Sequence, residues 1–435
     1  MPRTAALLLC LLAALPAAAV ETVTDASPAL EVEEIMHLIE KVREKPFKES
    51  IRAADQSLED FEAYLDRTLD AQIPPELAEN FETIMRAVGL YRGEGLGDFK
   101  AVSKMVMMSQ AAAYYDPETA AFYVVMHDMA DSMRRPVYAH ELTHGLQDQH
   151  FDLNAYLLDH AGGALNDDQL LARQAVVEGE ATYVMTIASV VDMLGMTPPR
   201  EMLGIGIEMQ AGMSAKQLSA MVEGSPVLAE MGGDMAAAVE AMDEIPAFLM
   251  ETLMGSYLKG QAFIHAVQAG GWTAVDALYA KPPVSTEQIL HPEKYAAGEM
   301  PVSFDLDALD PALTRGWTRL HANALGEMQW RVVLEEHGLD DIARDVAAGW
   351  DGDAYAVYAD AADATLLLLT THWDTEQDAE EFEAAYQGVV DAKGGHGAVT
   401  RLVRRDGRWV GVVEGGDPAT ALTRLEALAA LPRTR

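Results

Sequence analysis

Residues 137–153 of the chain read VYAHELTHGLQDQHFDL. This stretch contains the pattern H-E-x-x-H, in which His140 and His144 are four positions apart and Glu141 follows the first histidine directly. On a helix, residues at i and i+4 project from one face, so both imidazoles would point the same way. A catalytic zinc needs two nitrogen ligands on a rigid helix and a carboxylate beside them that reaches a bound water. The stretch therefore predicts a helix that carries a zinc site, with Glu141 as the general base.

A third metal ligand is available on a further helix, which begins at Asp167 or Asp168 and continues through LLARQAVVEGEATYVMTIASV, residues 170–190. Glu178 and Glu180 are ionisable residues in this mostly apolar segment, where a carboxylate without a partner is costly. A zinc ion would supply the partner. The two glutamates project about 200° apart around a helix, so only one of them can face the metal. The spacing alone leaves open which one.

HELTH, followed on a later helix by the glutamate of E-x-x-A, resembles the gluzincin class of thermolysin-like zinc metalloproteases. The longer pattern HELTHGLQDQHFDL with VVEGEAT is similar to an uncharacterised group of exported prokaryotic proteins within that class, over roughly residues 105–295. The resemblance implies a zincin-like fold, Zn²⁺ as the cofactor and a peptide or protein as the substrate. It also implies that His140, His144 and Glu178 are the metal ligands and that Glu141 is the catalytic base.

The chain departs from the pattern E-x-x-A-D of several gluzincins at the fifth position, where Thr182 stands instead of the aspartate. In the class, that aspartate typically orients a zinc-bound histidine. Threonine is a weaker acceptor. Either Asp148 takes over the role, or the zinc is held less firmly.

The mechanism that the resemblance implies is hydrolysis of a peptide bond by a zinc-activated water. Zinc lowers the pKa of its water to about 7, Glu141 takes the proton, and the hydroxide attacks a carbonyl that the metal polarises. The resulting oxyanion needs a donor besides zinc, and gluzincins commonly use a tyrosine or a histidine. The candidates are Tyr257, in the pattern Y-x-x-G-x-x-F, and His291, in the HPEKY loop. For each, the alternative is a structural role, as a buried hydrogen-bonded tyrosine or a histidine that braces a loop.

Helical periodicity is present well before the motif. Apolar residues recur at spacings of three and four from Glu31 to Val42, and two more amphipathic stretches follow at 58–69 and 75–90. Residues 111–116 and 120–126 are short aromatic and β-branched runs on either side of a turn, which is typical of a β-hairpin. We expect the second strand of this hairpin to be the edge strand that binds an extended peptide.

The composition changes beyond about Met300. A strand-like AYAVYA, a second strand over 364–371, an acidic helix over 374–392 and a hairpin over 399–413 with an Asp-Gly turn indicate a separate, small α/β or α+β accessory domain over 300–435. The fold class is therefore α+β, with a helix-rich zincin-like catalytic domain over 20–299, an N-terminal helical layer over 31–100 and a core over 105–295.

Residues 20–100 could be a pro-segment or an integral layer. We favour the layer, because no obvious long linker separates it from the hairpin.

Residues 1–19, MPRTAALLLCLLAALPAAA, have the positive start, apolar run and small-residue cleavage site of a secretory signal peptide. No later apolar run reaches the roughly 18 residues of a membrane span. We therefore expect an exported protein, periplasmic or extracellular, with no transmembrane anchor once the signal is removed. Cys10, the only cysteine, lies in this segment, and Leu9 before it disfavours lipidation. Any metal in the mature chain must then be held by histidines and carboxylates.

The charge is lopsided, with 69 Asp and Glu against 31 Lys and Arg and a net charge of −38. A surface this acidic repels phosphate backbones and anionic lipid heads, which excludes nucleic acid as a partner. It would favour cationic substrates, but it does not choose the substrate, and the oligomeric state stays open.

Two other functions would use the same residues. A non-catalytic protein could keep the zincin fold to bind peptides or partners, but such a protein has no use for the base Glu141. A zinc hydrolase could act on a non-peptide amide or ester, because the same activated water attacks any acyl carbon. The sequence favours a secreted zinc metallopeptidase over both.

Overall fold

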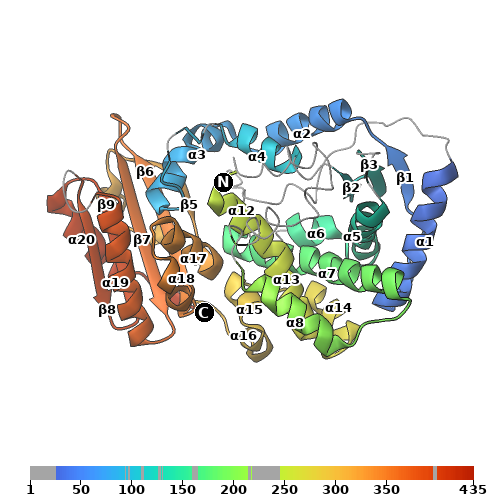
Figure 1. Ribbon diagram of the computed structural model, residues 1–435. Helices are drawn as coiled ribbons and strands as arrows, with labels where there is room; N and C mark the ends of the chain where they lie inside the picture. The colour runs from blue at the N-terminus through green and yellow to red at the C-terminus, as the bar shows by residue number, and fades with distance from the viewer. Residues whose placement is uncertain are drawn as a thin grey trace.

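The computed structural model describes residues 26–93, 95–96, 98–108, 112–125, 129, 131–158, 165–213, 217, 245–394 and 399–435. Within these residues the fold is α+β, as expected, with many helices and three separate sheets (Figure 1). The predicted signal peptide, residues 1–19, lies outside the described residues. Among the described helices, none combines the length and the apolar character that a membrane crossing requires.

The N-terminal region consists of α1 (Ala26–Arg43), β1 (Arg52–Asp55), α2 (Leu58–Gln72), α3 (Pro75–Val88) and α4 (Phe99–Met108). Local chemistry sets the helix ends. The Ser57 side chain caps α2 by accepting a hydrogen bond from the Asp60 N–H. Pro75 opens α3, and Gly89 ends it with a φ of 91°. The helices expected from the apolar periodicity in this region are confirmed.

The first sheet has the strand order β1-β3-β2, where β2 (Ala113–Asp116) and β3 (Ala121–Val124) form the predicted hairpin. The expectation that the second hairpin strand is the edge strand is wrong. β1 pairs in parallel with β3, with Arg52 opposite Ala121, so β3 has a neighbour on both sides. The edge strand beside the following helix is β2. The hairpin pattern could not show this, because the strand that displaces β3 from the edge lies about 70 residues earlier in the chain.

The H-E-x-x-H stretch lies on α5 (Asp131–Phe151), as predicted, and α5 is followed by α6 (Leu153–Leu158). The helix predicted to start at Asp167 or Asp168 is α7 (Asp167–Leu194). It begins with a capping box, in which the Asn166 side chain accepts from the Gln169 N–H and the Gln169 side chain accepts from the Asn166 N–H. Most of α7 is buried and α5 packs along it, which explains why residues 170–190 are so apolar.

Beyond α7 the described elements are α8 (Arg200–Ala211), α12 (Ala247–Met254), a π-helical turn (Gly255–Lys259), α13 (Gly260–Gln268), α14 (Trp272–Ala280), α15 (Thr286–Leu290) and α16 (Pro292–Ala297). Two glycines let α13 cross α7 very closely. A Cβ at Gly260 would lie 2.2 Å from the carbonyl oxygen of Ala175, and one at Gly179 would lie 2.2 Å from the carbonyl carbon of Gly260. Only glycine permits this approach. The crossing sets the π-helical turn against the middle of α7.

The chain beyond Met300 contains a five-stranded antiparallel sheet with the order β5-β6-β7-β9-β8. Its elements are β5 (Thr318–Asn323), α17 (Gly326–Glu336), α18 (Asp340–Ala347), β6 (Trp350–Ala359), β7 (Thr365–Trp373), α19 (Glu376–Ala392), β8 (Arg401–Asp406), β9 (Trp409–Gly415) and α20 (Pro418–Ala429). A short pair, β4 (Ser303–Phe304) with β10 (Arg433–Thr434), joins the ends of this part. The strands, the acidic helix and the Asp-Gly hairpin expected here are confirmed.

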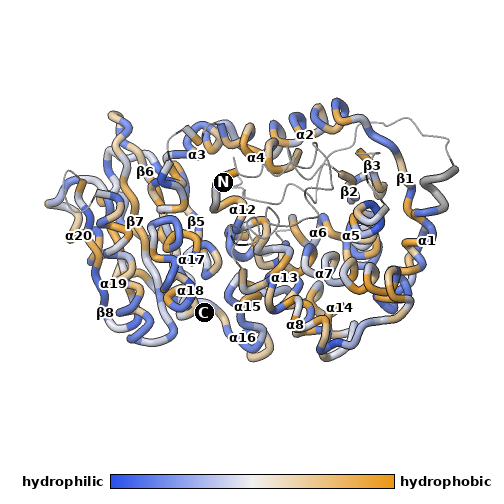
Figure 2. Tube along the Cα trace, in the orientation of Figure 1, coloured by the Kyte–Doolittle hydropathy of each residue, from blue (hydrophilic) through white to orange (hydrophobic). Residues whose placement is uncertain are grey.

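Helices cover both faces of the five-stranded sheet. Leu366 and Leu368 of β7 pack in the cluster that includes residues of α20, whereas Leu367 and Leu369 pack in the cluster that includes residues of α19. Alternate residues of a strand point to opposite faces, so a strand covered on both sides is apolar throughout. Figure 2 shows a run of hydrophobic residues within β7, whose sequence contains four successive leucines.

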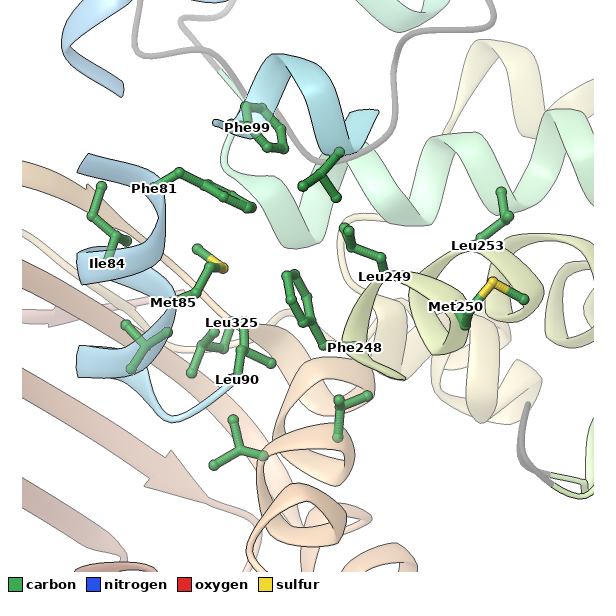
Figure 3. Close-up of a cluster of buried hydrophobic side chains, with 14 of the residues drawn as sticks. Phe81, Ile84, Met85, Leu90, Phe99, Phe248, Leu249, Met250, Leu253 and Leu325 are labelled. Carbon is green, nitrogen blue, oxygen red and sulfur yellow. The ribbon is translucent and has the colours of Figure 1, made fainter. Parts of the chain in front are cut away.

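One hydrophobic core is common to the helical part and the five-stranded sheet. Phe81 of α3, Phe99 of α4 and Phe248 of α12 point toward one another and toward Leu325, just before α17 (Figure 3). The rings of Phe81 and Phe99 lie 3.9 Å apart. The same cluster contains Trp330 and residues of β6, β7 and β9. A second core surrounds α5, α7, α13 and the small sheet, and this core positions the site.

Candidate metal centre

Three donor atoms from α5 and α7 converge at one point. The Nε2 atoms of His140 and His144 are 3.1 Å apart, and their rings lie nearly perpendicular at 87°. The Glu178 carboxylate oxygen Oε2 lies 3.2 Å from the first nitrogen and 3.5 Å from the second. The i, i+4 spacing on α5 brings the histidines together, and the packing of α7 against α5 brings the glutamate to them.

The spacing of these donors fits a small tetrahedral cation. Ligand atoms about 2.0–2.1 Å from a tetrahedral zinc lie about 3.3 Å from one another, and the three separations here are 3.1, 3.2 and 3.5 Å. The donor set is also suited to the ion, because two imidazoles and one carboxylate are typical of catalytic zinc. His140 is 6% exposed and Glu178 is 4% exposed, so water does not solvate their polar atoms freely.

The charges of Glu178 and His144 shift the pKa values of both groups in opposite directions. Burial lowers the pKa of His144, but the Glu178 carboxylate outweighs it and raises the pKa to about 9. Burial likewise raises the pKa of Glu178, and the two imidazoles outweigh it and hold that pKa well below its ordinary value. A positive charge beside the Glu178 carboxylate is thus favoured at this point of the fold.

Glu141 lies beside the three donors, with a carboxylate oxygen within 4.8 Å of the ring nitrogens of both histidines. Its Oε2 accepts a hydrogen bond of 3.1 Å from the backbone N–H of Tyr115. This bond joins the edge strand β2 to the helix that carries the motif. Burial raises the pKa of the Glu141 carboxyl, while the two histidines and the Tyr115 N–H oppose the rise.

Gln147, three residues after His144, contacts the ring of that histidine, whereas the sequence offered Asp148 for this contact, with looser zinc binding as the alternative. Its Oε1 lies 2.8 Å from the Nδ1 of His144. Asp148 instead accepts from the Tyr115 hydroxyl at 2.9 Å and from the Leu153 N–H at 3.0 Å. The Thr182 hydroxyl is buried and has no hydrogen-bond partner among the described residues.

Glu180 is the glutamate that faces away from the histidines. Its carboxylate forms an ion pair with Arg43 at the end of α1 and accepts a hydrogen bond of 2.5 Å from the Tyr279 hydroxyl. Arg43 also bonds Asp276 at 2.6 Å and lies over the Trp272 ring. Both members of the Arg43–Glu180 pair are 1% exposed. The structure thus places Glu178 at the candidate centre and Glu180 in a structural ion pair.

Tyr257 lies at the centre, on the π-helical turn. Its ring stacks on that of His140, with centroids 5.5 Å apart and planes inclined by 16°. Burial, with help from the Glu178 and Glu141 carboxylates, raises the pKa of Tyr257 well above its ordinary value. A π-helical turn inside a helix is often found at functional sites.

His291 is not brought to this cluster. It lies between α15 and α16, and its Nε2 is 3.0 Å from the Glu327 carboxylate of α17. The hydrogen bond to Glu327 raises its pKa. The nearby carboxylates Glu287 and Asp374 both bond the Lys294 amine at 2.5 Å, so His291 belongs to a polar connection between the helical part and the sheet.

Two residues of the site were not singled out from the sequence. Gln147 carried a usable signal, since it lies three positions after His144 and therefore on the same helix face. Tyr115 carried none, because it acts through its backbone N–H, which every non-proline residue has. Outside the site, the ion pair between Arg43 and Glu180 was not predicted either, because the two residues are 137 positions apart and no local pattern connects them.

In comparisons with known proteins, a match was found for the C-terminal part of the chain. Residues 315–426 match a family described as a domain of unknown function (DUF8575). This match spans β5 to α20 and does not include the candidate metal centre. No curated protein and no solved structure matches the chain.

Proposed function

We propose that this protein is a zinc-dependent metallopeptidase. The observation that supports the proposal is the convergence of His140, His144 and Glu178 at separations of 3.1 to 3.5 Å, with the Glu141 carboxylate beside them. These residues would hold the zinc by two imidazole nitrogens and one carboxylate oxygen. The segment 1–19 supports export of the enzyme.

A bound zinc would supply an activated water and polarise the substrate carbonyl. Glu141 takes the proton of the attacking water and passes it to the leaving amine. The N–H of Tyr115 holds one oxygen of this carboxylate, which limits its rotation during the transfer. Gln147 keeps His144 oriented. The Tyr257 hydroxyl stays protonated because of its raised pKa, and it can donate a hydrogen bond to the oxyanion that develops.

The test compares the mature wild-type protein with Glu141→Gln for zinc content and for hydrolysis of an unfolded protein such as casein. The amide keeps the size of the side chain and cannot take a proton. We expect equal zinc in both proteins and a loss of activity of about 10²- to 10⁴-fold in the variant. Chelation should remove the wild-type activity, and added zinc should restore it.

Either of two results would contradict the proposal. One is a wild-type protein that binds zinc but hydrolyses no peptide bond in unfolded proteins or peptides. The other is a metal-free wild-type protein that cannot be reconstituted with zinc.

A further inference from the structure

The side chain of Gln147 bridges the two helices that carry the donors of the centre. Its Oε1 lies 2.8 Å from the Nδ1 of His144 on its own helix, and its Nε2 donates a hydrogen bond of 3.0 Å to the carbonyl oxygen of Val177 on α7. The side chain is 1% exposed, so water does not compete for either bond. Both polar ends of a buried amide are thus used within the protein.

The carbonyl of Val177 fixes which way the amide points. A carbonyl oxygen only accepts hydrogen bonds, so the group facing it must be the NH₂ of Gln147. The Oε1 atom must then face His144, and because an amide oxygen only accepts, the Nδ1 of His144 must carry the proton. The Nε2 of that ring then has its lone pair directed at His140 and Glu178, as a metal ligand requires.

The same amide sets the distance between the two ligand-bearing helices at the level of the centre. Val177 directly precedes Glu178 on α7. A displacement of this turn of α7 along α5 would break the bond to Val177 and would move the Glu178 carboxylate relative to both imidazoles. One side chain therefore controls the tautomer of His144 and the approach of Glu178.

We infer that Gln147 is the positioning residue of this metal centre, and that it fixes His144 with Nδ1 protonated and ties the Glu178 turn of α7 to α5. The inference rests on the proposed function only in requiring that the centre binds zinc. Gln147 would then do for His144 what the aspartate of the pattern E-x-x-A-D does for a zinc-bound histidine in gluzincins. In this chain Thr182 stands at the position of that aspartate.

The test measures the zinc dissociation constant by competition with a chromophoric chelator in three full-length variants. Gln147→Leu removes both hydrogen bonds at similar volume, and we expect zinc binding to weaken about 10- to 100-fold. Gln147→Glu keeps an acceptor for the His144 Nδ1–H but loses the donor to Val177, so we expect zinc binding between that of the wild type and that of Gln147→Leu, and a lower melting temperature. The matched control is Gln261→Leu, which removes another buried amide between helices, the one that bonds Thr186 from α13 at 2.7 Å.

A second readout is the histidine tautomer, observed by ¹⁵N NMR of the histidine-labelled, zinc-bound proteins. We expect one ring with Nδ1 protonated and Nε2 bound to metal in the wild type and in Gln147→Glu, and a mixture of states in Gln147→Leu. The inference is overturned if Gln147→Leu binds zinc no more weakly than Gln261→Leu. If Gln147→Leu does not fold, zinc binding by Gln147→Glu that is as tight as in the wild type overturns it by itself, because the lost bond to Val177 would then have no effect on the centre.

These outcomes are separable from those of the proposed function. A wild-type protein that binds zinc, shows the expected variant series and hydrolyses no peptide overturns the peptidase and supports the role of Gln147. A wild-type protein that hydrolyses peptides while Gln147→Leu binds zinc normally overturns the role of Gln147 alone. A wild-type protein that binds no zinc overturns both.

Discussion

Glu178 and Glu180 are two positions apart on α7, yet their carboxylates contact different side chains. Glu178 faces the two imidazoles of α5, and Glu180 faces the guanidinium of Arg43. Because the intervening residue is Gly179, at the close crossing with α13, the helix cannot rotate here to exchange the two side chains without a clash. The two glutamates should therefore respond differently to the same substitution.

Glu178→Ala is expected to abolish zinc binding, because it removes the carboxylate that faces both imidazoles. Glu180→Ala is expected to retain zinc and to lower the free energy of unfolding by about 3–5 kcal/mol, because it leaves Arg43 buried without its partner. Zinc content by elemental analysis and urea unfolding in the presence of a chelator separate the two effects. Loss of zinc in Glu180→Ala alone would show that the ligand assignment is reversed.

Asp168 gives the fold a pH dependence. Its Oδ1 accepts from the backbone N–H of Thr286 at 3.0 Å and from the Thr286 hydroxyl at 2.5 Å. Burial raises the pKa of this carboxyl to about 8, and the nearby Asp353 and Glu327 contribute to the rise. The folded protein therefore holds a proton that the unfolded chain releases near pH 3.9. Stability is lost as the pH rises from about 4 to about 8, by at most about 1.4 kcal/mol per pH unit from this group.

Asp168→Asn should remove this pH dependence. The amide oxygen can still accept both bonds from Thr286, and the amide does not ionise. We expect the variant and the wild type to be similarly stable at about pH 4, and the variant to be more stable at about pH 9. Urea unfolding of both proteins across this range checks the prediction, and parallel curves would contradict it.

At the scale of elements, the contact between α7 and α13 depends on the absence of side chains at its two glycines. Alanine at a helical position normally stabilises by about 0.5–1 kcal/mol relative to glycine. At Gly260 the added methyl would lie 2.2 Å from the Ala175 carbonyl oxygen, so we expect Gly260→Ala to destabilise by about 1–3 kcal/mol instead. Its matched control is Gly206→Ala on α8, where nothing lies within 4 Å of the added methyl and a gain is expected. Equal melting-temperature changes in the two variants would show that the helices have room to separate.

The sequence predicted the elements that carry the donors better than it predicted their neighbours. The i, i+4 spacing of His140 and His144 and the polar residues of α7 are local patterns, and they are enough to place the ligands on two helices. Whether Glu178 or Glu180 faces the motif depends on the rotation of α7 against α5. That rotation is set by packing across the whole of both helices, and no short pattern encodes it.

The oxyanion candidates illustrate the same limit. Tyr257 and His291 had equal support from the sequence, since each is a suitable residue downstream of the motif. Tyr257 reaches His140 because the π-helical turn directly precedes Gly260, where α13 crosses α7 closely. The Nε2 of His291 lies 3.0 Å from the carboxylate of Glu327 on α17, a helix of the C-terminal part.

The strand order β1-β3-β2 could not be predicted from local patterns either. Strand β1 has only four residues, and it pairs in parallel with a strand about 70 residues later in the chain.

At the scale of the whole molecule, the helical part and the C-terminal sheet complete one core. Phe81 and Phe248 pack in the same cluster as Trp330 and the strands of the sheet (Figure 3). We therefore expect a chain that ends at residue 299 to lose cooperative folding, because these side chains would face water. A chain that ends at residue 432, which lacks only β10 and the last residue, should keep it. Thermal unfolding followed by circular dichroism distinguishes the two. A cooperative transition in the shorter chain would show that the helical part folds alone.

The ion pair between Arg43 and Glu180 joins residues 137 positions apart, and the shared core runs from Ala54 to Val412. Contacts this distant in sequence form late, since the intervening chain must be present before they can close. During synthesis the first helix meets α5 before α7 has been made, but the core has none of its closing strands until the last hundred residues have been made. We therefore expect the shared core to close only after nearly the whole chain has been synthesised.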